Sequence, residues 1–303
     1  MRIAHIGLVG YGEVGKIFSA GLRGQGGVDS VAAWDLKFAD PGAGDAQRQH
    51  AAAAGVAATA SLHELCGRSD LVISAVTASS TLAVAEEAAP HLRAGAVFLD
   101  LNSASPGTKQ QAAALVDARG AHYVEAGVMT SVPPYGIRVP MLLGGAHAAA
   151  LASVLQGWGM DAKAASEQLG VASAIKMCRS IMIKGLEALV AESYATARHY
   201  GVEDQVLPTL QETFPGIDWS AQGAYFLSRM AQHGQRRAEE MRESARTVRE
   251  AGMEPLMASA IAARQQWVAD LAAAGAFTAV DKKGAPWQDY ADAILAARRA
   301  PAP

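Results

Sequence analysis

Short apolar runs alternate with segments of helical hydrophobic spacing through the first half of the chain. The runs have the length and the flanking glycine or polar residues that are typical of buried strands. They predict strands at residues 3–9, 28–34, 55–59, 70–76, 96–101, 122–126 and 139–145. Because these strands alternate with helices, we expect a doubly wound and mostly parallel sheet.

The pattern changes near Leu169, where strand-like runs stop and long helical stretches begin. Residues 171–200 carry apolar positions at helical spacing without an internal proline, which predicts one helix of about 30 residues, roughly 45 Å long. Further helices are expected at residues 205–214, 225–252, 255–274 and 287–299. The predicted fold class is therefore α/β, with a sheet domain at residues 1–162 and an all-helical domain at residues 163–303.

Composition and charge narrow the range of partners. The chain has 303 residues, 50% of them hydrophobic and 18% charged, which is enough to build a large core in two domains. The net charge of −3 gives no basic field for nucleic acid. Five arginines cluster late in the chain among glutamates, and we expect them to form a solvated helix face: Arg236, Arg237, Arg242, Arg246 and Arg249.

The cysteines and the absence of long apolar stretches indicate a cytoplasmic protein. Cys66 and Cys178 lack the spacing of a disulfide framework, a redox motif or a metal site, so a reducing compartment and no bound metal are expected. Neither an export signal nor a membrane-spanning run is recognisable, and we expect no membrane partner.

The first predicted strand runs into the glycine pattern Gly-x-Gly-x-x-Gly, formed by Gly10, Gly12 and Gly15, and a helical segment follows. In this context the pattern is the fingerprint of a Rossmann dinucleotide-binding domain, with the pyrophosphate at the helix N-terminus. An acid at the end of the second strand, Asp35, lies where such domains bind the ribose hydroxyls. Asp35 favours NAD, whereas Lys37 and Arg48 could accommodate the phosphate of NADP.

Polar residues follow two further strands at the edge where ligands bind in open α/β sheets. The hydroxyls after residues 70–76 could contact the cofactor or cap the next helix, and the sequence does not choose between these roles. The expected cofactor contacts are Gly10, Tyr11, Gly12, Glu13, Val14, Asp35, Val76, Thr77, Ser80 and Asn102.

Lys176 lies near the start of the predicted long helix, with Ser180 one turn further along the same face. A lysine there could donate or accept the proton of a reacting oxygen and favour negative charge on it. The alternative is an exposed lysine on an amphipathic helix.

Three motifs resemble those of the β-hydroxyacid dehydrogenases, the group of 3-hydroxyisobutyrate, tartronate-semialdehyde and 6-phosphogluconate dehydrogenases. They are the glycine-rich residues 7–15, the Asp-Leu-Asn-Ser-Ala-Ser-Pro segment at 100–106, and the glycine-to-lysine segment at 170–176. The resemblance covers nearly the whole chain, most strongly its first half, and points to a branch with a shortened helical domain. It implies that Lys176 is the catalytic acid/base.

The chain departs from the family pattern in its substrate-binding segments. Ser180 stands where the family has asparagine, and residues 125–131 replace its Asp-x-Pro-Val-Ser-Gly-Gly loop, with Met129 in place of serine. His233 falls where the family has a second lysine, although a structural role is the alternative. The expected substrate contacts are Asn102, Ser103, Met129, Thr130, Ser131, Ser180 and His233.

Two further cations, Lys184 and Arg179, follow Lys176 in the predicted long helix. Lys184 lies well round the predicted helix from Lys176, and we expect it on the outside. Arg179 could pair with a substrate carboxylate or face solvent.

The resemblance implies an NAD(P)-dependent oxidoreductase that transfers a hydride between nicotinamide and a small β-hydroxy acid or its oxo counterpart. The alternatives are an imine or ketone reductase of the same fold and a dinucleotide-binding protein without catalysis. A thin helical domain would leave several apolar side chains poorly covered, which predicts a homodimer through that domain. These side chains are Leu186, Leu189, Met230 and Met257.

Overall fold

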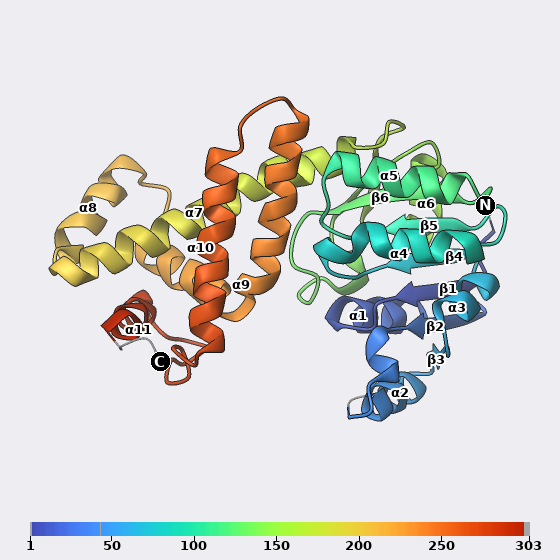
Figure 1. Ribbon diagram of the computed structural model, residues 1–303, viewed down its shortest axis with the longest axis horizontal. Helices are drawn as coiled ribbons and strands as arrows, with labels where there is room; N and C mark the ends of the chain where they lie inside the picture. The colour runs from blue at the N-terminus through green and yellow to red at the C-terminus, as the bar shows by residue number, and fades with distance from the viewer. Residues whose placement is uncertain (1, 43, 300–303) are drawn as a thin grey trace. The chain divides into compact units, whose positions relative to one another are not determined.

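The computed structural model describes residues 2–42 and 44–299. It divides into two compact units, an N-terminal unit that ends at Met177 and a helical unit that begins at Cys178 (Figure 1). The N-terminal unit extends past residue 162 and includes one further strand and the first turns of the long helix.

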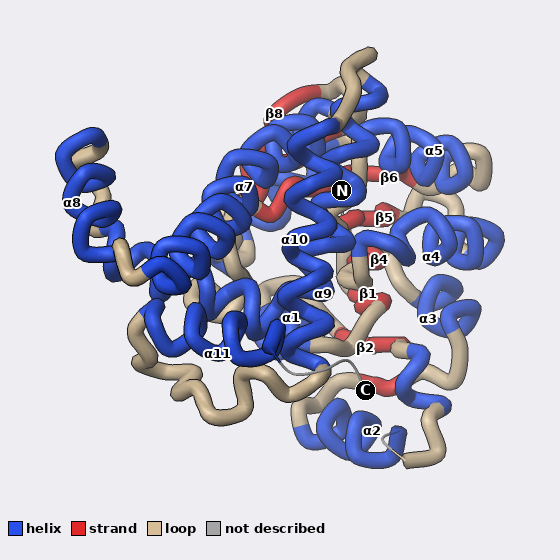
Figure 2. The backbone as a smooth tube through the Cα atoms, turned by 60° about the vertical axis from the view of Figure 1, so that its left-hand side comes forward, coloured by secondary structure: helices blue, strands red, loops and turns tan. Residues whose placement is uncertain are grey.

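A single eight-stranded sheet forms the centre of the N-terminal unit, in the order β3-β2-β1-β4-β5-β6-β7-β8. All neighbouring strands are parallel except β6 and β7, which are antiparallel. The predicted doubly wound sheet is thus confirmed (Figure 2). The strands are β1 (His5–Val9), β2 (Ser30–Trp34), β3 (Ala57–Ala58), β4 (Leu71–Ser74), β5 (Val97–Asp100), β6 (His122–Val128), β7 (Met141–Gly144) and β8 (Ala162–Ser166).

Helices cover both faces of the sheet and create two apolar cores. One core packs Phe18 and Leu22 of the first helix against strand residues such as Leu8. The other packs Leu65 and Val116 against the opposite face. The helices are α1 (Glu13–Leu22), α2 (Gly44–Ala53), α3 (Leu62–Arg68), α4 (Thr81–Ala88), α5 (Pro106–Asp117) and α6 (Ala148–Gly157), with short 3₁₀ helices η1 (Leu36–Ala39), η2 (Ala78–Ser80), η3 (Ala89–His91) and η4 (Gly136–Arg138).

The helical unit contains no strand among its described residues. Its elements are α7 (Val171–Tyr200), which starts in the N-terminal unit, α8 (Glu203–Thr213), α9 (Trp219–Glu250), α10 (Leu256–Ala273) and α11 (Trp287–Arg299). Helix α9 begins earlier than expected, since the Asp218 carboxylate accepts a hydrogen bond from the Ala221 N–H (3.0 Å) and caps it.

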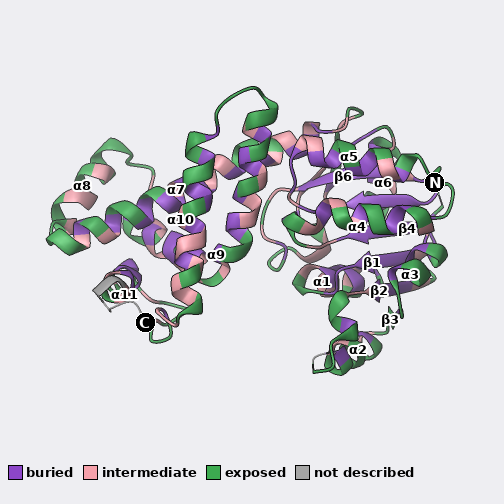
Figure 3. Cartoon of the chain, in the orientation of Figure 1, coloured by how far each residue is buried: buried purple, intermediate pink, exposed green. Residues whose placement is uncertain are grey.

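A core built around Tyr194, Met230 and Trp287 holds the helical unit together. Met230 is fully buried, so its expected exposure is wrong, whereas Leu189 and Met257 are exposed. Figure 3 shows buried residues along the strands and inward helix faces, with exposed residues on the outer faces. Across the part of the chain described, no helix combines the length and apolarity needed to span a bilayer.

Candidate functional site

A glycine-rich turn joins β1 to α1 at the edge of the sheet where its parallel strands end. Gly10 has a φ of +94°, and a Cβ there would lie 2.5 Å from the Ala75 carbonyl oxygen, so a side chain fits neither the conformation nor the space. A Cβ at Gly15 would collide with the Gly10 carbonyl oxygen. Both glycines therefore let backbone segments approach closely.

Gly12, in contrast to Gly10 and Gly15, faces open space. A Cβ there would meet no atom within 4 Å, and Gly12, the N-cap of α1, offers no side chain to the helix's first N–H groups. Open space before uncapped N–H groups fits the pyrophosphate of a dinucleotide. Glu13 is exposed and Val14 partly buried beside this turn.

Tyr11 contributes its backbone to this turn rather than its side chain. The tyrosine is 2% exposed, its ring packs against Phe38, and its hydroxyl lies 3.1 Å from His50 Nδ1. A cofactor contact by Tyr11 would therefore come from its backbone.

Asp35 follows β2 and lies against the glycine-rich turn. Its Oδ2 accepts a hydrogen bond from the Tyr11 N–H (2.6 Å) and its Oδ1 accepts one from the Lys37 N–H (2.8 Å). The carboxylate is thus held in place by backbone groups and retains acceptor capacity for a ribose. The Lys37 side chain is exposed, whereas Arg48 donates to the Phe38 carbonyl and to Asp45.

The loops after β4 and β5 are tied together by Asn102. Its Oδ1 accepts from the Val76 N–H (2.7 Å), and its Nδ2 donates to Ser74 Oγ (2.9 Å). Since β4 lies between β1 and β5, these loops adjoin the glycine-rich turn. Asn102 is 4% exposed, so it acts on this edge through the backbone that it holds.

Several hydroxyl side chains lie in the loop after β4. Thr77 Oγ1 lies 3.1 Å from Ser79 Oγ and 3.0 Å from Ser80 Oγ, and Ser80, the N-cap of α4, makes no side-chain cap hydrogen bond. Thr77 is exposed and Ser80 partly buried, which leaves hydroxyl groups at the ligand-binding edge of the sheet.

A buried charged cluster, which sequence reasoning missed, lies at the end of β5 and holds the loop that follows it. Lys109 Nζ lies 2.9 Å from Asp100 Oδ1, and the Tyr123 hydroxyl donates to Asp100 Oδ2 (2.6 Å). Asp100 also accepts from the Asn102 N–H (2.8 Å), so the cluster fixes the loop that carries Asn102. Burial raises the pKa of the Tyr123 hydroxyl well above its ordinary value, and the Asp100 carboxylate adds to this effect.

The segment expected to contact substrate leaves the end of β6, close to the start of α7. The Met129 N–H donates to the Pro140 carbonyl (2.9 Å); Met129 and Ser131 are partly buried and Thr130 is exposed. A Cβ at Gly127 would lie 2.8 Å from the Ala172 carbonyl oxygen and 3.5 Å from Lys176 Cβ. The structure therefore brings Lys176, which is partly exposed, to the strand that leads into residues 129–131.

The remaining expected site residues are in the helical unit, apart from Ser103, which is partly buried after β5. Ser180 is 6% exposed on α7, Arg179 is exposed, and His233 is partly buried on α9.

The expected outward position of Lys184 is wrong. Lys184 is 7% exposed, and its Nζ lies 2.9 Å from Glu240 Oε2. Burial lowers the pKa of Lys184, and the Glu240 carboxylate offsets this only in part.

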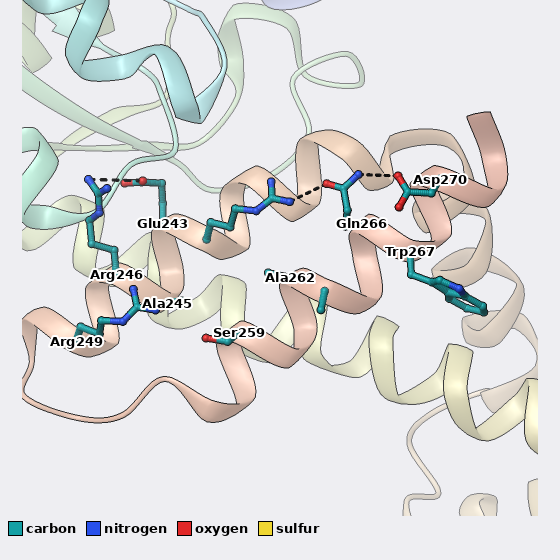
Figure 4. A pocket seen from close by; sticks show the side chains of 11 residues that line it. Glu243, Ala245, Arg246, Arg249, Ser259, Ala262, Gln266, Trp267 and Asp270 are labelled. Atoms are coloured by element: carbon teal, nitrogen blue, oxygen red, sulfur yellow. Dashed lines mark hydrogen bonds and ion pairs between the residues drawn. The ribbon is translucent and has the colours of Figure 1, made fainter. Parts of the chain in front are cut away.

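The arginine cluster is only partly the solvated face that its sequence predicts. Arg237 is buried and pairs with Glu187, which also accepts from Gln265 Nε2 (2.9 Å). Arg242, Arg246 and Arg249 instead line an open groove of about 580 Å³ between α9 and α10 (Figure 4). Glu243 and Asp270 line the same groove, so its charge is mixed.

No group of three or more histidine, cysteine or acidic side chains among the described residues is arranged to hold a metal ion.

Comparisons with known proteins divide the chain in a similar way. Residues 5–159 match the NAD binding domain of 6-phosphogluconate dehydrogenase, and residues 197–268 match a domain of unknown function, DUF1932.

Three solved structures illustrate the similarity. A conserved hypothetical protein from Sinorhizobium meliloti 1021 is 38% identical over 98% of this chain and 97% of its own, with a TM-score of 0.73. The conserved protein MTH1747, of unknown function and structurally similar to 3-hydroxyacid dehydrogenases, is 30% identical over 88% of this chain and 97% of its own, with a TM-score of 0.67. The 3-hydroxyisobutyrate dehydrogenase of Mycobacterium tuberculosis, solved with L-serine, is 18% identical over 96% of this chain and 99% of its own, with a TM-score of 0.66, and shares the fold.

The sheet topology, the glycine-rich turn with Asp35, and the matched NAD binding domain agree with one another. The helical unit has its own counterpart in the second matched domain. The chain belongs to the β-hydroxyacid dehydrogenase superfamily, in a branch that joins the NAD binding domain of 6-phosphogluconate dehydrogenase to a helical C-terminal domain.

Proposed function

We propose that the protein is an NAD(P)-dependent oxidoreductase that acts on a small β-hydroxy acid or its oxo counterpart. The observation that carries the proposal is the placement of Lys176 beside Gly127, at the strand leading into residues 129–131, in the same unit as an open glycine-rich turn. An acid/base group and a nicotinamide site are the two parts that hydride transfer at a hydroxyl carbon needs.

The residues around the turn fit a nicotinamide dinucleotide. The N–H groups at the start of α1 would bind the pyrophosphate, Asp35 would bind the ribose, and the loops that Asn102 holds would border the nicotinamide. When bound, the nicotinamide supplies or removes the hydride. Lys176 would move the proton at the substrate oxygen and stabilise negative charge on it.

Asp35 supports NAD as the preferred cofactor. A carboxylate accepts hydrogen bonds from ribose hydroxyls, whereas it would repel the 2′-phosphate of NADP. Lys37 is the exposed cation nearest to Asp35 in sequence, and its charge would favour the 2′-phosphate of NADP. We weight Asp35 more, because two backbone N–H groups fix its carboxylate in place.

Substrate contacts in this proposal come from residues 129–131 and Ser103 of the N-terminal unit. Met129 stands where the family has a serine for the substrate carboxylate, and this change favours one alternative, reduction of an imine or ketone without an acid group. Lys176 argues against an imine, since a cationic lysine would repel an iminium ion.

Cofactor titration tests the proposal first. NADH and NADPH fluorescence would be followed as protein is added, and we expect saturable binding with NADH the tighter ligand. A panel of hydroxy acids, oxo acids, ketones and imines would then be assayed with each cofactor. Absence of binding to either dinucleotide would overturn the proposal, and turnover of imines alone would replace it with the reductase alternative.

A further inference from the structure

A fully buried carboxylate on the central part of β6 meets the first residues of α7. Glu125 is 0% exposed, and its Oε1 accepts hydrogen bonds from the Gly170 N–H (2.7 Å) and the Ala172 N–H (3.1 Å). Helices leave their first N–H groups without intrahelical partners, and a carboxylate is a strong acceptor for them. Glu125 therefore caps the start of α7 from a strand.

The neighbouring strand leaves space for this carboxylate. Gly144 of β7 lies opposite Glu125 in the sheet register, and a Cβ there would collide with Glu125 Oε1. Gly170 has a φ of +99°, a conformation that glycine adopts readily, where the chain turns into α7. The geometry around Glu125 is thus set by two glycines as well as by two hydrogen bonds.

A second contact between β6 and α7 lies two residues further along the same strand face. A Cβ at Gly127 would lie 2.8 Å from the Ala172 carbonyl oxygen and 3.5 Å from Lys176 Cβ. Glu125 accepts from the N–H of Ala172, and Gly127 leaves room for the carbonyl of the same residue. Together they set the distance between Lys176 and the strand that leads into residues 129–131.

We propose that Glu125 is a positioning residue for Lys176, holding the first turns of α7 against β6 so that the lysine amino group faces the reacting oxygen. This inference rests on the proposed function for the role of Lys176. The effect is exerted through helix α7, since Glu125 hydrogen bonds the backbone at Gly170 and Ala172.

Hydrogen bonding and charge can be separated at this position. Glu125 Oε2 is buried and has no hydrogen-bond partner among the described residues, so Oε1 alone makes the cap. Glu125→Gln keeps an acceptor oxygen at that place and removes the charge, whereas Glu125→Ala removes both. If the hydrogen bonds position Lys176, the glutamine variant rescues what the alanine variant loses.

A matched control comes from another helix of the same unit. Ser61 Oγ accepts from the Glu64 N–H (3.1 Å) and caps α3, which carries none of the proposed site residues. Ser61→Ala therefore removes a cap without touching α7 or Lys176. A general effect of losing a helix cap would show in both variants.

The experiment measures Lys176 directly and then turnover. Full-length wild type, Glu125→Ala, Glu125→Gln and Ser61→Ala would be treated with a limiting amine-reactive acylating reagent, and modification of Lys176 would be quantified by peptide mass spectrometry against exposed Lys37. For each variant we would also measure the NADH dissociation constant, and kcat and KM on any hydroxy acid that the wild type oxidises.

We expect Glu125→Ala to change the Lys176 acylation rate about threefold or more relative to Lys37, and to lower kcat about tenfold or more. The NADH dissociation constant should stay within about twofold, and Glu125→Gln should restore both readouts to within about threefold of wild type. Ser61→Ala should leave both unchanged. If Glu125→Ala does not fold, Glu125→Asp, which withdraws the oxygens by about 1.5 Å, takes its place with the same expectation.

Unchanged acylation in Glu125→Ala would overturn the inference, as would an equal change in Ser61→Ala or no recovery in Glu125→Gln. Acylation needs no substrate, so it decides the positioning role even if the wild type oxidises no hydroxy acid. That last result would count against the proposed function alone.

Discussion

Two glycines of the same turn should fail in different ways when replaced by alanine. A Cβ at Gly15 collides with the Gly10 carbonyl, so Gly15→Ala should lower both the free energy of unfolding and NADH affinity. A Cβ at Gly12 meets nothing within 4 Å, and Gly12 has an ordinary φ of −76°, so Gly12→Ala should keep stability. It should still weaken NADH binding, because the methyl group occupies the space expected for the pyrophosphate.

Urea unfolding and NADH fluorescence titration of both variants check this expectation. Equal NADH affinity in Gly12→Ala and wild type would contradict the placement of the pyrophosphate at the start of α1.

Cofactor choice is the second test at this scale. We expect wild type to bind NADH about tenfold more tightly than NADPH, about 1.4 kcal/mol, and Asp35→Ala to lose most of that difference. The matched change Lys37→Ala should widen the preference, since it removes the cation that would favour a phosphate. Dissociation constants of each variant for NADH and NADPH test this expectation. Equal or tighter NADPH binding by wild type would show that Lys37 outweighs Asp35 in cofactor choice.

Sequence reasoning located residues whose constraint is local. The glycines and Asp35 belong to one short strand-turn-helix unit, so spacing alone indicates their roles. Glu125 could not be recognised in this way, because its partners Gly170 and Ala172 lie 45 and 47 residues away. Lys109 was missed for the same kind of reason: an isolated charge in an alanine-rich helix does not reveal that it pairs with buried Asp100.

At the scale of elements, the strands with buried apolar runs were predicted, whereas β8, the last strand in the sheet order, was not. β8 carries exposed residues at 163–165 and therefore has no apolar run to recognise. The long helix was placed correctly, but its faces were not. Two helices contact α7: α9 through Glu240 and Arg237, and α10 through Gln265. Lys184 is therefore buried, whereas a helix with a single buried apolar face would leave it exposed.

A carboxylate that ties the starts of β1 and β4 together should give the N-terminal unit a pH-dependent stability. Asp70 Oδ2 accepts from the N–H groups of Ala4 (3.0 Å) and His5 (2.9 Å), and Arg93 lies 3.0 Å from its Oδ1. Burial alone would raise the pKa of Asp70, but these three groups outweigh it and hold the pKa below its ordinary 3.8.

A lowered pKa means that this stabilisation is fully present above the ordinary pKa and is lost as pH falls through the folded-state pKa. Asp70→Asn should therefore cost about 1 kcal/mol at neutral pH, and the difference from wild type should shrink below pH 3.8. Urea unfolding across this pH range measures it, with the exposed carboxylate variant Asp45→Asn as a control expected to stay within about 0.5 kcal/mol. A difference that is constant with pH would contradict the account.

At the scale of the whole molecule, an apolar stripe on α7 predicts self-association. Met182 and Leu189 are 66% and 59% exposed and lie seven residues apart, which places them on one helix face. Exposed apolar side chains grouped in this way are typical of interfaces, and a symmetric pair is the commonest assembly.

Light scattering at micromolar concentration should give twice the 31.4 kDa of one chain. The double variant Met182→Glu with Leu189→Glu should give the mass of one chain and keep its helical content. A wild-type mass near 31.4 kDa would count against the dimer.

The central claim is that this chain performs hydride transfer with Lys176 as its acid/base, and turnover by Lys176→Ala tests it most directly. The assay follows NADH formation on the best hydroxy acid of the panel, with exposed Lys163→Ala as the matched control. We predict that kcat falls about a hundredfold or more in Lys176→Ala, with the NADH dissociation constant unchanged and Lys163→Ala equal to wild type. Equal turnover by Lys176→Ala and wild type would contradict the account.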